Sequence, residues 1–316
     1  MKIFFVKVIN KLIYKLKLYK ILGNKNDKVV LLYHRVNKRS LIENYYLKGI
    51  FVSEENFFKQ MRLLSNSERK NNIIITFDDG YYDNYQYAYP ILKEFNLKGI
   101  FFITINFIEQ IEYQWIDILN HYSKLNNLNL KEFKKLSLKI KKMNIKDRVN
   151  FLNNLNKDKL ENDKAMNWKD LNDMKNTQII ANHTMNHPNF SQENYDNIFT
   201  ELKLAKEKIE NNLKIKDIYF AYPDGDIGSN QSETLNILKK LEYKYAFTTK
   251  RGVWDEKRDN SLLIKRIPIY YWDDVATFNN KLYGINIEDN LNYRSIIAKI
   301  LNFIGLKEWI KKKLKF

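Results

Sequence analysis

Short apolar runs alternate with segments of helical periodicity along most of the chain. Alternating strands and helices are typical of βα units that build a parallel sheet, and about seven such strands fit a barrel. The pattern therefore predicts an α/β barrel, whose chemistry would collect at the C-terminal ends of the strands. The expected strands are residues 29–36, 72–79, 99–104, 177–184, 217–223, 244–249 and 262–269, and clear helical segments are residues 85–95, 195–213 and 231–243.

Residues 117–167 interrupt this alternation, because they show helical periodicity with many Lys and Asn and no strand-like run. We interpret them as a helical insertion between two barrel units. The expected organisation is a basic N-terminal segment (1–28), a barrel domain (29–293) and a basic C-terminal helix (294–316).

The two ends of the chain combine lysines with large apolar residues, and they carry most of the net charge of +17. Neither end offers about 18 uncharged residues to span a bilayer, and residues 1–22 lack the uninterrupted apolar centre of a signal peptide. Both ends are predicted to form basic amphipathic helices. They suit either an anionic membrane surface or docking on the protein's own core. The expected location is cytoplasmic, including the inner face of the cytoplasmic membrane.

Composition narrows the chemistry further. The absence of cysteine excludes disulfides and thiolate sites, so a metal site must use His and carboxylate ligands. The isoelectric point of about 9.5 suggests a protein that binds nucleic acid as one candidate class. Because residues 29–293 hold little of the excess charge and show no recognition motif, we predict no nucleic-acid partner.

Candidate catalytic groups follow several predicted strands. Asp78 and Asp79 end the second run, His34 ends the first, and His183 and His187 follow the fourth at i, i+4 spacing. Two imidazoles and one carboxylate form the open three-ligand site of hydrolytic zinc enzymes. The second aspartate would then be available to accept a proton from water.

These residues resemble the polysaccharide deacetylases that share the NodB homology domain, carbohydrate esterase family 4. The sequence "TFDDG" (76–80) is similar to the first motif of that family, and "HTMNHP" (183–188) is similar to its second. "AYPDG" (221–225) resembles the third motif, while "YHRV" (33–36) and "KRIPI" (265–269) resemble the opening and closing strands. The resemblance covers about residues 29–270.

The resemblance implies a distorted (β/α)7 barrel that binds a divalent metal, often zinc, and removes an N-acetyl group from an amino sugar. It also implies roles for individual residues. Asp78 would be the general base, and the backbone N–H of Tyr81 would help to bind the oxyanion. The implied metal ligands are Asp79, His183 and His187, and the implied side of the sugar groove is formed by Tyr222, Pro223 and Asp224.

Two departures from the family pattern call for substitutes. Ala221 stands where the third motif usually opens with an arginine that orients the base, so we predict that Arg266 takes this role from its own strand end. No histidine follows His187, although the family uses a late histidine as general acid. We therefore predict that His34 is the acid, with a packing role as its alternative.

The expected substrate is an amino sugar in a cell-envelope glycan or in its lipid-linked precursor. Deformylation of such a lipid-linked sugar would use identical residues and stays open as an alternative. A non-catalytic glycan-binding relative is a second alternative, suggested by Ala221 and the missing late histidine.

Overall fold

A computed structural model describes residues 2–23, 26–111, 113–155 and 165–287, so the predicted C-terminal helix (294–316) lies outside the described residues. Seven parallel strands form a closed barrel in the order β1-β4-β5-β6-β7-β8-β9. The predicted (β/α)7 barrel is therefore confirmed. The barrel strands are β1 (Val29–Tyr33), β4 (Ile73–Phe77), β5 (Gly99–Ile103), β6 (Ile179–Asn182), β7 (Tyr219–Ala221), β8 (Tyr245–Arg251) and β9 (Ile264–Pro268).

The barrel strands form because their side chains are apolar on both faces, as expected for a parallel sheet covered by helices. Every residue of β1 and of β5 is buried. The barrel closes between β1 and β9, where Leu31 lies opposite Ile267. The expected run at 29–36 divides after Tyr33, because β2 (Arg35–Asn37) leaves the barrel and pairs with β3 (Phe51–Ser53).

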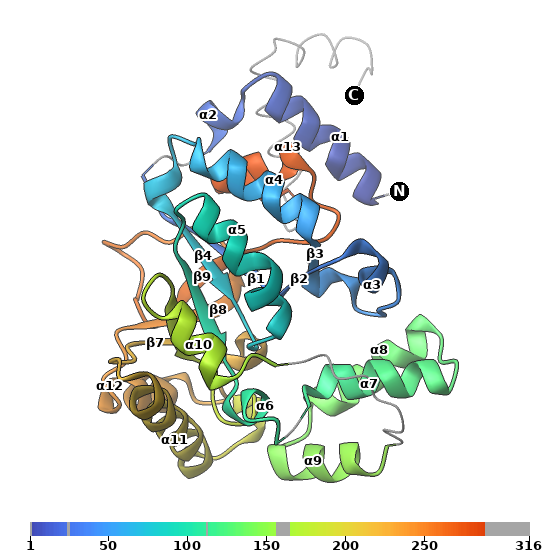
Figure 1. Cartoon of the computed structure of the whole chain (residues 1–316), viewed down its shortest axis with the longest axis vertical. Coiled ribbons are helices and arrows are strands. Elements are labelled where there is room, and N and C mark those ends of the chain that lie inside the picture. Colours follow the sequence, from blue (N-terminus) through green and yellow to red (C-terminus); the bar gives the residue numbers. More distant parts are fainter. Residues whose placement is uncertain (1, 24–25, 112, 156–164, 288–316) are drawn as a thin grey trace, which may run out of the picture.

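Helices cover the barrel on its outside (Figure 1). The α-helices are α1 (Lys2–Lys15), α2 (Tyr19–Leu22), α3 (Arg39–Glu43), α4 (Glu54–Ser65), α5 (Tyr89–Glu94), α6 (Ile105–Ile108), α7 (Trp115–Leu125), α8 (Leu130–Lys141), α9 (Ile145–Asn153), α10 (Trp168–Met174), α11 (Tyr195–Leu213), α12 (Gln231–Lys240) and α13 (Val275–Leu282). Short helical turns are η1 (Lys48–Ile50), η2 (Lys70–Asn72), η3 (Asn84–Ala88), η4 (Phe190–Gln192) and η5 (Pro223–Gly225).

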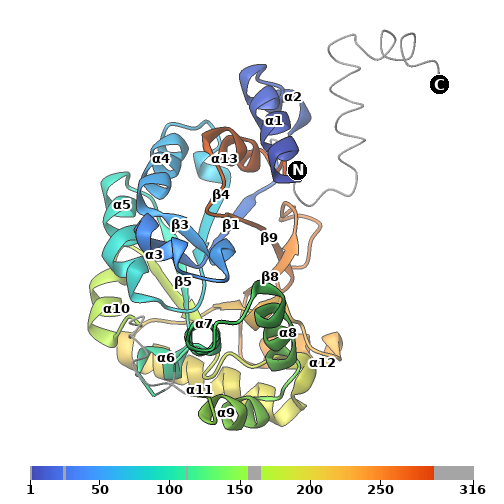
Figure 2. The same ribbon diagram turned by 90° about the vertical axis from the view of Figure 1, so that its right-hand side faces the viewer.

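The segment between β5 and β6 that was interpreted above as a helical insertion forms helices α7, α8 and α9 in the part that the structure describes. These helices lie together on one side of the barrel in Figure 1, and this side faces the viewer in Figure 2. They have a small core of their own, which includes Trp115, Leu119, Phe133 and Leu152. The insertion is thus a compact helical unit, and α10 follows it before β6.

The N-terminal helix α1 packs on α13. Asn280 donates from Nδ2 to the carbonyl of Asn10 at 3.0 Å and to its Oδ1 at 2.8 Å, and Ile13 is fully buried. This face agrees with docking on the protein's own core, one of the two interpretations of the N-terminal segment. Within the described ranges, no helix has both the length and the hydropathy needed to cross a bilayer.

Candidate active site

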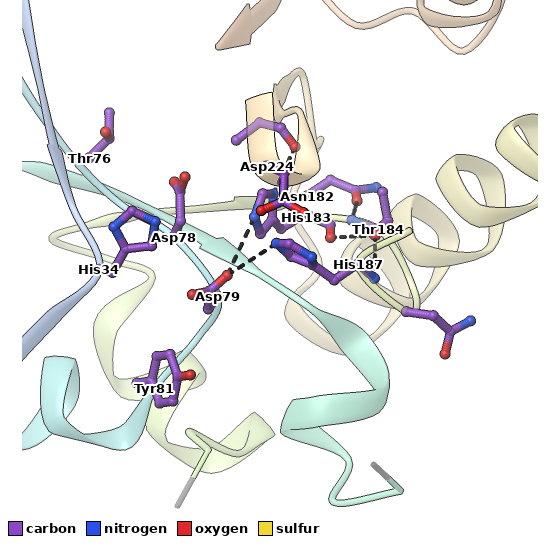
Figure 3. Close-up of polar contacts among 12 residues, drawn as sticks. His34, Thr76, Asp78, Asp79, Tyr81, Asn182, His183, Thr184, His187 and Asp224 are labelled. Atoms are coloured by element: carbon purple, nitrogen blue, oxygen red, sulfur yellow. Dashed lines mark hydrogen bonds and ion pairs between the residues drawn. The ribbon is translucent and has the colours of Figure 1, made fainter. Parts of the chain in front are cut away.

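The candidate catalytic residues lie at the C-terminal ends of barrel strands, as the barrel prediction requires. Asp78 and Asp79 directly follow β4, His34 follows β1, and His183 follows β6. Figure 3 shows His34, Asp78, Asp79, His183 and His187 gathered in one region. The strand order β1-β4-β5-β6 brings together residues that lie far apart in the sequence, such as His34 and His187.

Asp79, His183 and His187 form a buried group in which each side chain offers one potential ligand atom, one carboxylate oxygen and two imidazole nitrogens in all. Asp79 Oδ1 lies 3.5 Å from Nε2 of His183 and 3.5 Å from Nε2 of His187. Two ligand atoms that each lie about 2.1 Å from one tetrahedral ion are about 3.4 Å apart. Nδ1 of His183 contacts the carbonyl of Ala221 at 2.7 Å, which leaves its Nε2 directed toward Asp79. The residues present therefore fit a divalent ion held by two imidazoles and one carboxylate.

Backbone conformation separates the two adjacent aspartates. Asp79 has a φ of 83° and Gly80 has a φ of 93°, so the chain turns sharply as it leaves β4. A left-handed conformation at a residue other than glycine costs roughly 1–2 kcal/mol. The turn directs Asp79 toward the histidines, while Asp78 faces a different partner.

The partner of Asp78 is Arg266, which lies on β9 inside the barrel. Its two terminal nitrogens each donate to one carboxylate oxygen of Asp78 at 2.7 Å. Arg266 is fully buried and also donates from Nε to the carbonyl of Thr248 at 2.8 Å. Burial of Asp78 raises the pKa of its carboxyl group, but the Arg266 guanidinium, together with His183 and His34, outweighs this effect and holds the pKa below its usual value. Arg266, which the sequence predicted to orient the base, therefore lies opposite the Asp78 carboxylate.

The two histidines differ in their electrostatic environment. Burial, together with the neighbouring His183, lowers the pKa of His187 to about 4, although Asp79 and Asp224 oppose this shift. Burial also lowers the pKa of His183, but its hydrogen bond to Asp79 and the charge of Asp78 raise it, with a net shift upward. His187 is therefore neutral near pH 7, which is the form that binds a metal.

His34 is half-buried, and Figure 3 places its imidazole beside Asp78. The backbone is held by Asn84, whose Nδ2 donates to the His34 carbonyl at 2.9 Å. The structure thus brings the predicted acid to the same side of the site as the predicted base.

The predicted substrate residues occupy different environments. Tyr222 is fully buried and donates its hydroxyl to the carbonyl of Leu262 at 2.8 Å, so the structure does not bring this side chain to the groove. Pro223 is also buried. Asp224 lies beside His187 and pairs with Lys141 at 2.5 Å. Burial raises the pKa of Asp224, but Lys141 and His187 more than offset this effect and keep the pKa below its usual value.

Tyr81, whose backbone N–H was predicted to bind an oxyanion, has a fully buried side chain. Its hydroxyl donates to Oδ2 of Asp117 in the helical insertion at 3.0 Å. Arg35 stacks over the Tyr81 ring at 4.2 Å from the centroid and pairs with Asp83 at 2.7 Å. This network anchors the turn that carries Asp78 and Asp79.

Sequence reasoning missed several residues around the histidines. Glu201 of α11 accepts from the backbone N–H groups of Met185 and Asn186 at 3.0 and 2.9 Å. Arg148 of α9 donates to the carbonyls of Asn186 and His187 at 2.7 Å each. No local pattern marks these residues, because their partners lie 15 or more positions away in the sequence.

Comparisons with known proteins identify related sequences and folds. A family model described as polysaccharide deacetylase matches residues 65–246. The solved deacetylase PplD of Streptococcus pyogenes, in complex with acetate, superposes with a TM-score of 0.58 and 20% identity, over 82% of this chain and 99% of that one. The polysaccharide deacetylase BC0361 of Bacillus cereus superposes with a TM-score of 0.53 and 20% identity, over 81% of this chain and 69% of that one.

A curated sequence relative is YxkH of Bacillus subtilis (strain 168), whose name places it among the polysaccharide deacetylases. The match is 44% identical over 48 residues, which is 14% of this chain and only 17% of YxkH. At 20% identity, the two solved structures establish the likeness of the fold.

Proposed function

This chain belongs to the polysaccharide deacetylase family, and from this premise we propose that it hydrolyses the N-acetyl group of an amino sugar with the aid of a divalent metal ion. The observation that carries the proposal is the buried Asp79–His183–His187 group beside an Asp78 carboxylate held by Arg266. A binding groove alone would need neither an open three-ligand site nor a buried base next to it.

The proposed metal is zinc, because two imidazoles and one carboxylate are a common zinc ligand set. When bound, the ion would polarise the amide carbonyl and make water a stronger nucleophile at neutral pH. Asp78 accepts the proton of the attacking water, and Arg266 keeps Asp78 ionised and fixes its orientation. The neutral form of His187 leaves its nitrogen available to the ion without prior loss of a proton.

Two further groups complete the proposed mechanism. The backbone N–H of Tyr81 donates to the oxyanion that forms from the amide carbonyl. His34 donates a proton to the nitrogen of the leaving sugar amine as the C–N bond breaks. The position of His34 beside Asp78 supports this assignment, because base and acid must both reach the scissile amide.

The proposed substrate is a cell-envelope glycan or its lipid-linked precursor, with Asp224 and the backbone of Tyr222 and Pro223 along one side of the groove.

A second partner is an anionic membrane surface at the inner face of the cytoplasmic membrane. The side chains of Val8 and Leu12 on α1, Leu16 in the turn after it and Ile21 on α2 are between 41% and 62% exposed. These apolar side chains stand among exposed lysines, a composition suited to an anionic interface.

The test uses purified full-length protein loaded with zinc. It is incubated with lipid-linked N-acetylhexosamines and, in parallel, with soluble N-acetylhexosamine oligomers, and acetate is measured. We expect acetate release by the wild type, and we expect Asp79→Ala and His183→Ala to lose bound zinc and activity together. Stoichiometric zinc in a His183→Ala/His187→Ala double variant would contradict the ligand assignment.

The same incubation separates the alternatives. Release of formate from N-formyl analogues, with no acetate from N-acetyl sugars, would identify a deformylase. Binding of the sugars without either product would identify a glycan-binding relative and overturn the proposed hydrolysis.

A further inference from the structure

The helical insertion contacts the loop that carries His183 and His187. Helix α9 begins at Ile145 because the side chain of Asn144 accepts from the backbone N–H of Asp147 at 2.8 Å, which caps the first turn. Arg148 follows one residue after Asp147 and is buried. Its Nη2 donates to the carbonyls of Asn186 and His187, at 2.7 Å each. One guanidinium of the insertion therefore binds the backbone of a candidate metal ligand directly.

The loop from Asn182 to His187 has an unusual backbone, since Thr184 and His187 have φ values of 71° and 54°. Such a conformation persists only when surrounding contacts hold it. The backbone N–H groups of this loop donate to acceptors that belong to the barrel domain. The acceptors are Asn182 Oδ1 for Thr184, Glu201 Oε2 for Met185 and Asn186, and Thr184 Oγ1 for His187.

The carbonyl groups of the same loop are divided between two elements. The N–H groups of Ile105 and Asn106, at the start of α6, donate to the carbonyls of Thr184 and Met185. The next two carbonyls, those of Asn186 and His187, are bound by Arg148. A buried carbonyl without a donor is costly. Arg148 therefore satisfies the part of the loop that ends at the ligand itself.

A second cation of the insertion reaches a second loop of the site. Lys141, at the end of α8, pairs with Asp224 at 2.5 Å, and Asp224 lies beside His187. The turn between α8 and α9 also holds the chain just after His187. Asn189 donates to the carbonyl of Lys141 at 2.6 Å, and the Ile145 N–H donates to Glu193 at 2.6 Å.

We infer that the α8–α9 hairpin of the insertion is a positioning element of the active site, in which Arg148 holds the His187 backbone so that the imidazole keeps the geometry of a metal ligand. This role rests on the proposed function only in taking Asp79, His183 and His187 as the ligands. Loss of Arg148 removes none of these three side chains, but it removes the donor that holds the loop carrying His187.

The test measures zinc affinity by competition with a chelator in full-length wild-type protein, Arg148→Met, Arg148→Lys and Leu152→Ala. Loss of a residue that orients a metal ligand typically weakens metal affinity by about 10–100-fold, which is the expected loss for Arg148→Met. Arg148→Lys should show a smaller loss, because an ammonium group can still donate to a carbonyl. Leu152→Ala is the matched control, since Leu152 packs in the insertion core one turn after Arg148.

The control separates positioning from general stability. Leu152→Ala should lower the thermal stability yet keep the zinc affinity of the wild type. Wild-type affinity in Arg148→Met, or an equal loss in Leu152→Ala, would overturn the positioning role. If Arg148→Met fails to fold, Arg148→Lys decides, and undiminished zinc affinity in that variant would overturn the role as well.

Acetate release is measured in the same samples. A wild type that binds zinc with the expected dependence on Arg148 but releases no acetate would contradict the proposed function and leave the positioning role standing. If the wild type releases acetate and Arg148→Met keeps the zinc affinity of the wild type, only the positioning role is contradicted. A wild type that binds no zinc would overturn both.

Discussion

At the scale of single residues, the turn after β4 gives two adjacent carboxylates different partners. Asp79 faces two imidazoles, whereas Asp78 meets a guanidinium that the barrel supplies from β9. A buried carboxylate without a cation would become protonated and could not serve as a base at neutral pH. Arg266 supplies this cation from β9, which is the contact expected if it takes the role predicted for it in place of Ala221.

Replacement of the proposed base should separate turnover from metal binding. We expect Asp78→Asn to retain zinc but to lower kcat by about 10²–10⁴-fold, the usual contribution of general acid–base catalysis. The matched control is Asp217→Asn, which changes another buried aspartate, located before β7 at the opposite end of the barrel strands, and leaves the ligand group intact. Acetate release and zinc content are measured together. Loss of zinc in Asp78→Asn, or equal loss of turnover in Asp217→Asn, would argue against the assignment.

Because no histidine follows His187, His34 was predicted to be the general acid, and its replacement tests this assignment. His34→Ala should lower kcat by about 10²–10⁴-fold with normal zinc content, because the leaving amine would lack its proton donor. His121→Ala, a histidine of the insertion helix α7, serves as the control and should keep wild-type turnover. Turnover at the wild-type rate in His34→Ala would assign His34 to packing.

Residue patterns predicted part of the site. The i, i+4 histidines and the strand-end aspartate identified the group that the structure brings together, and the strand-end position of Arg266 identified its contact with Asp78. The buried hydroxyl of Tyr222 was not foreseeable, because its acceptor is the carbonyl of Leu262, 40 positions away. Arg148 was missed for the same physical reason. Contacts between distant segments depend on docking, which a local pattern does not encode.

At the scale of elements, the strands were predictable because a parallel barrel strand is buried on both faces and reads as an apolar run. The division between β1 and β2 was not predicted. The run at 29–36 was interpreted as one strand although His34 and Arg35 interrupt its apolar residues, and Arg35 and Asn37 bind Asp83 and draw β2 away from the barrel. Polar contacts therefore decided where the strand ends.

The junction between α11 and β7 contains a buried carboxylate whose titration should affect stability. Burial raises the pKa of Asp217 to about 8, although Lys206 and the Tyr219 N–H lower it. Because the folded state holds a proton that the unfolded chain releases above about pH 4, the wild type should lose stability as pH rises from about 4 to 8. Above pH 8 this loss is complete.

Substitution of that carboxylate should remove the pH dependence. We expect Asp217→Asn to be more stable than the wild type, by a margin that grows between pH 5 and pH 8. Each unit of pKa shift corresponds to about 1.4 kcal/mol. Urea unfolding at pH 5, 6.5 and 8 measures the difference, with Asp196→Asn, at an exposed position of α11, as control. A margin that does not change with pH would contradict the proposed titration.

At the scale of the whole molecule, α1 has two distinct faces. On one face Asn10 hydrogen-bonds to Asn280 of α13 and Ile13 is buried, while Val8, Leu12 and, just after the helix, Leu16 are exposed at i, i+4, i+8 spacing. The two interpretations of the N-terminal segment are therefore compatible, because docking uses one face and leaves the other available. Hydropathy alone could not separate them, since both faces carry apolar residues.

The exposed face of α1 predicts salt-sensitive binding to anionic membranes. Each Lys near such a surface contributes roughly 1 kcal/mol, and the attraction fades over about 8 Å at physiological salt. We expect full-length protein to float with vesicles that contain anionic lipid at low salt, and to float less at high salt. A Leu12→Gln/Leu16→Gln variant should float less than the wild type, because it loses apolar surface that would enter the interface. The matched control is Leu138→Gln/Leu204→Gln, which removes two exposed leucines from α8 and α11. Equal flotation of both double variants, or flotation that does not depend on anionic lipid, would exclude α1 as the membrane contact and favour a soluble substrate.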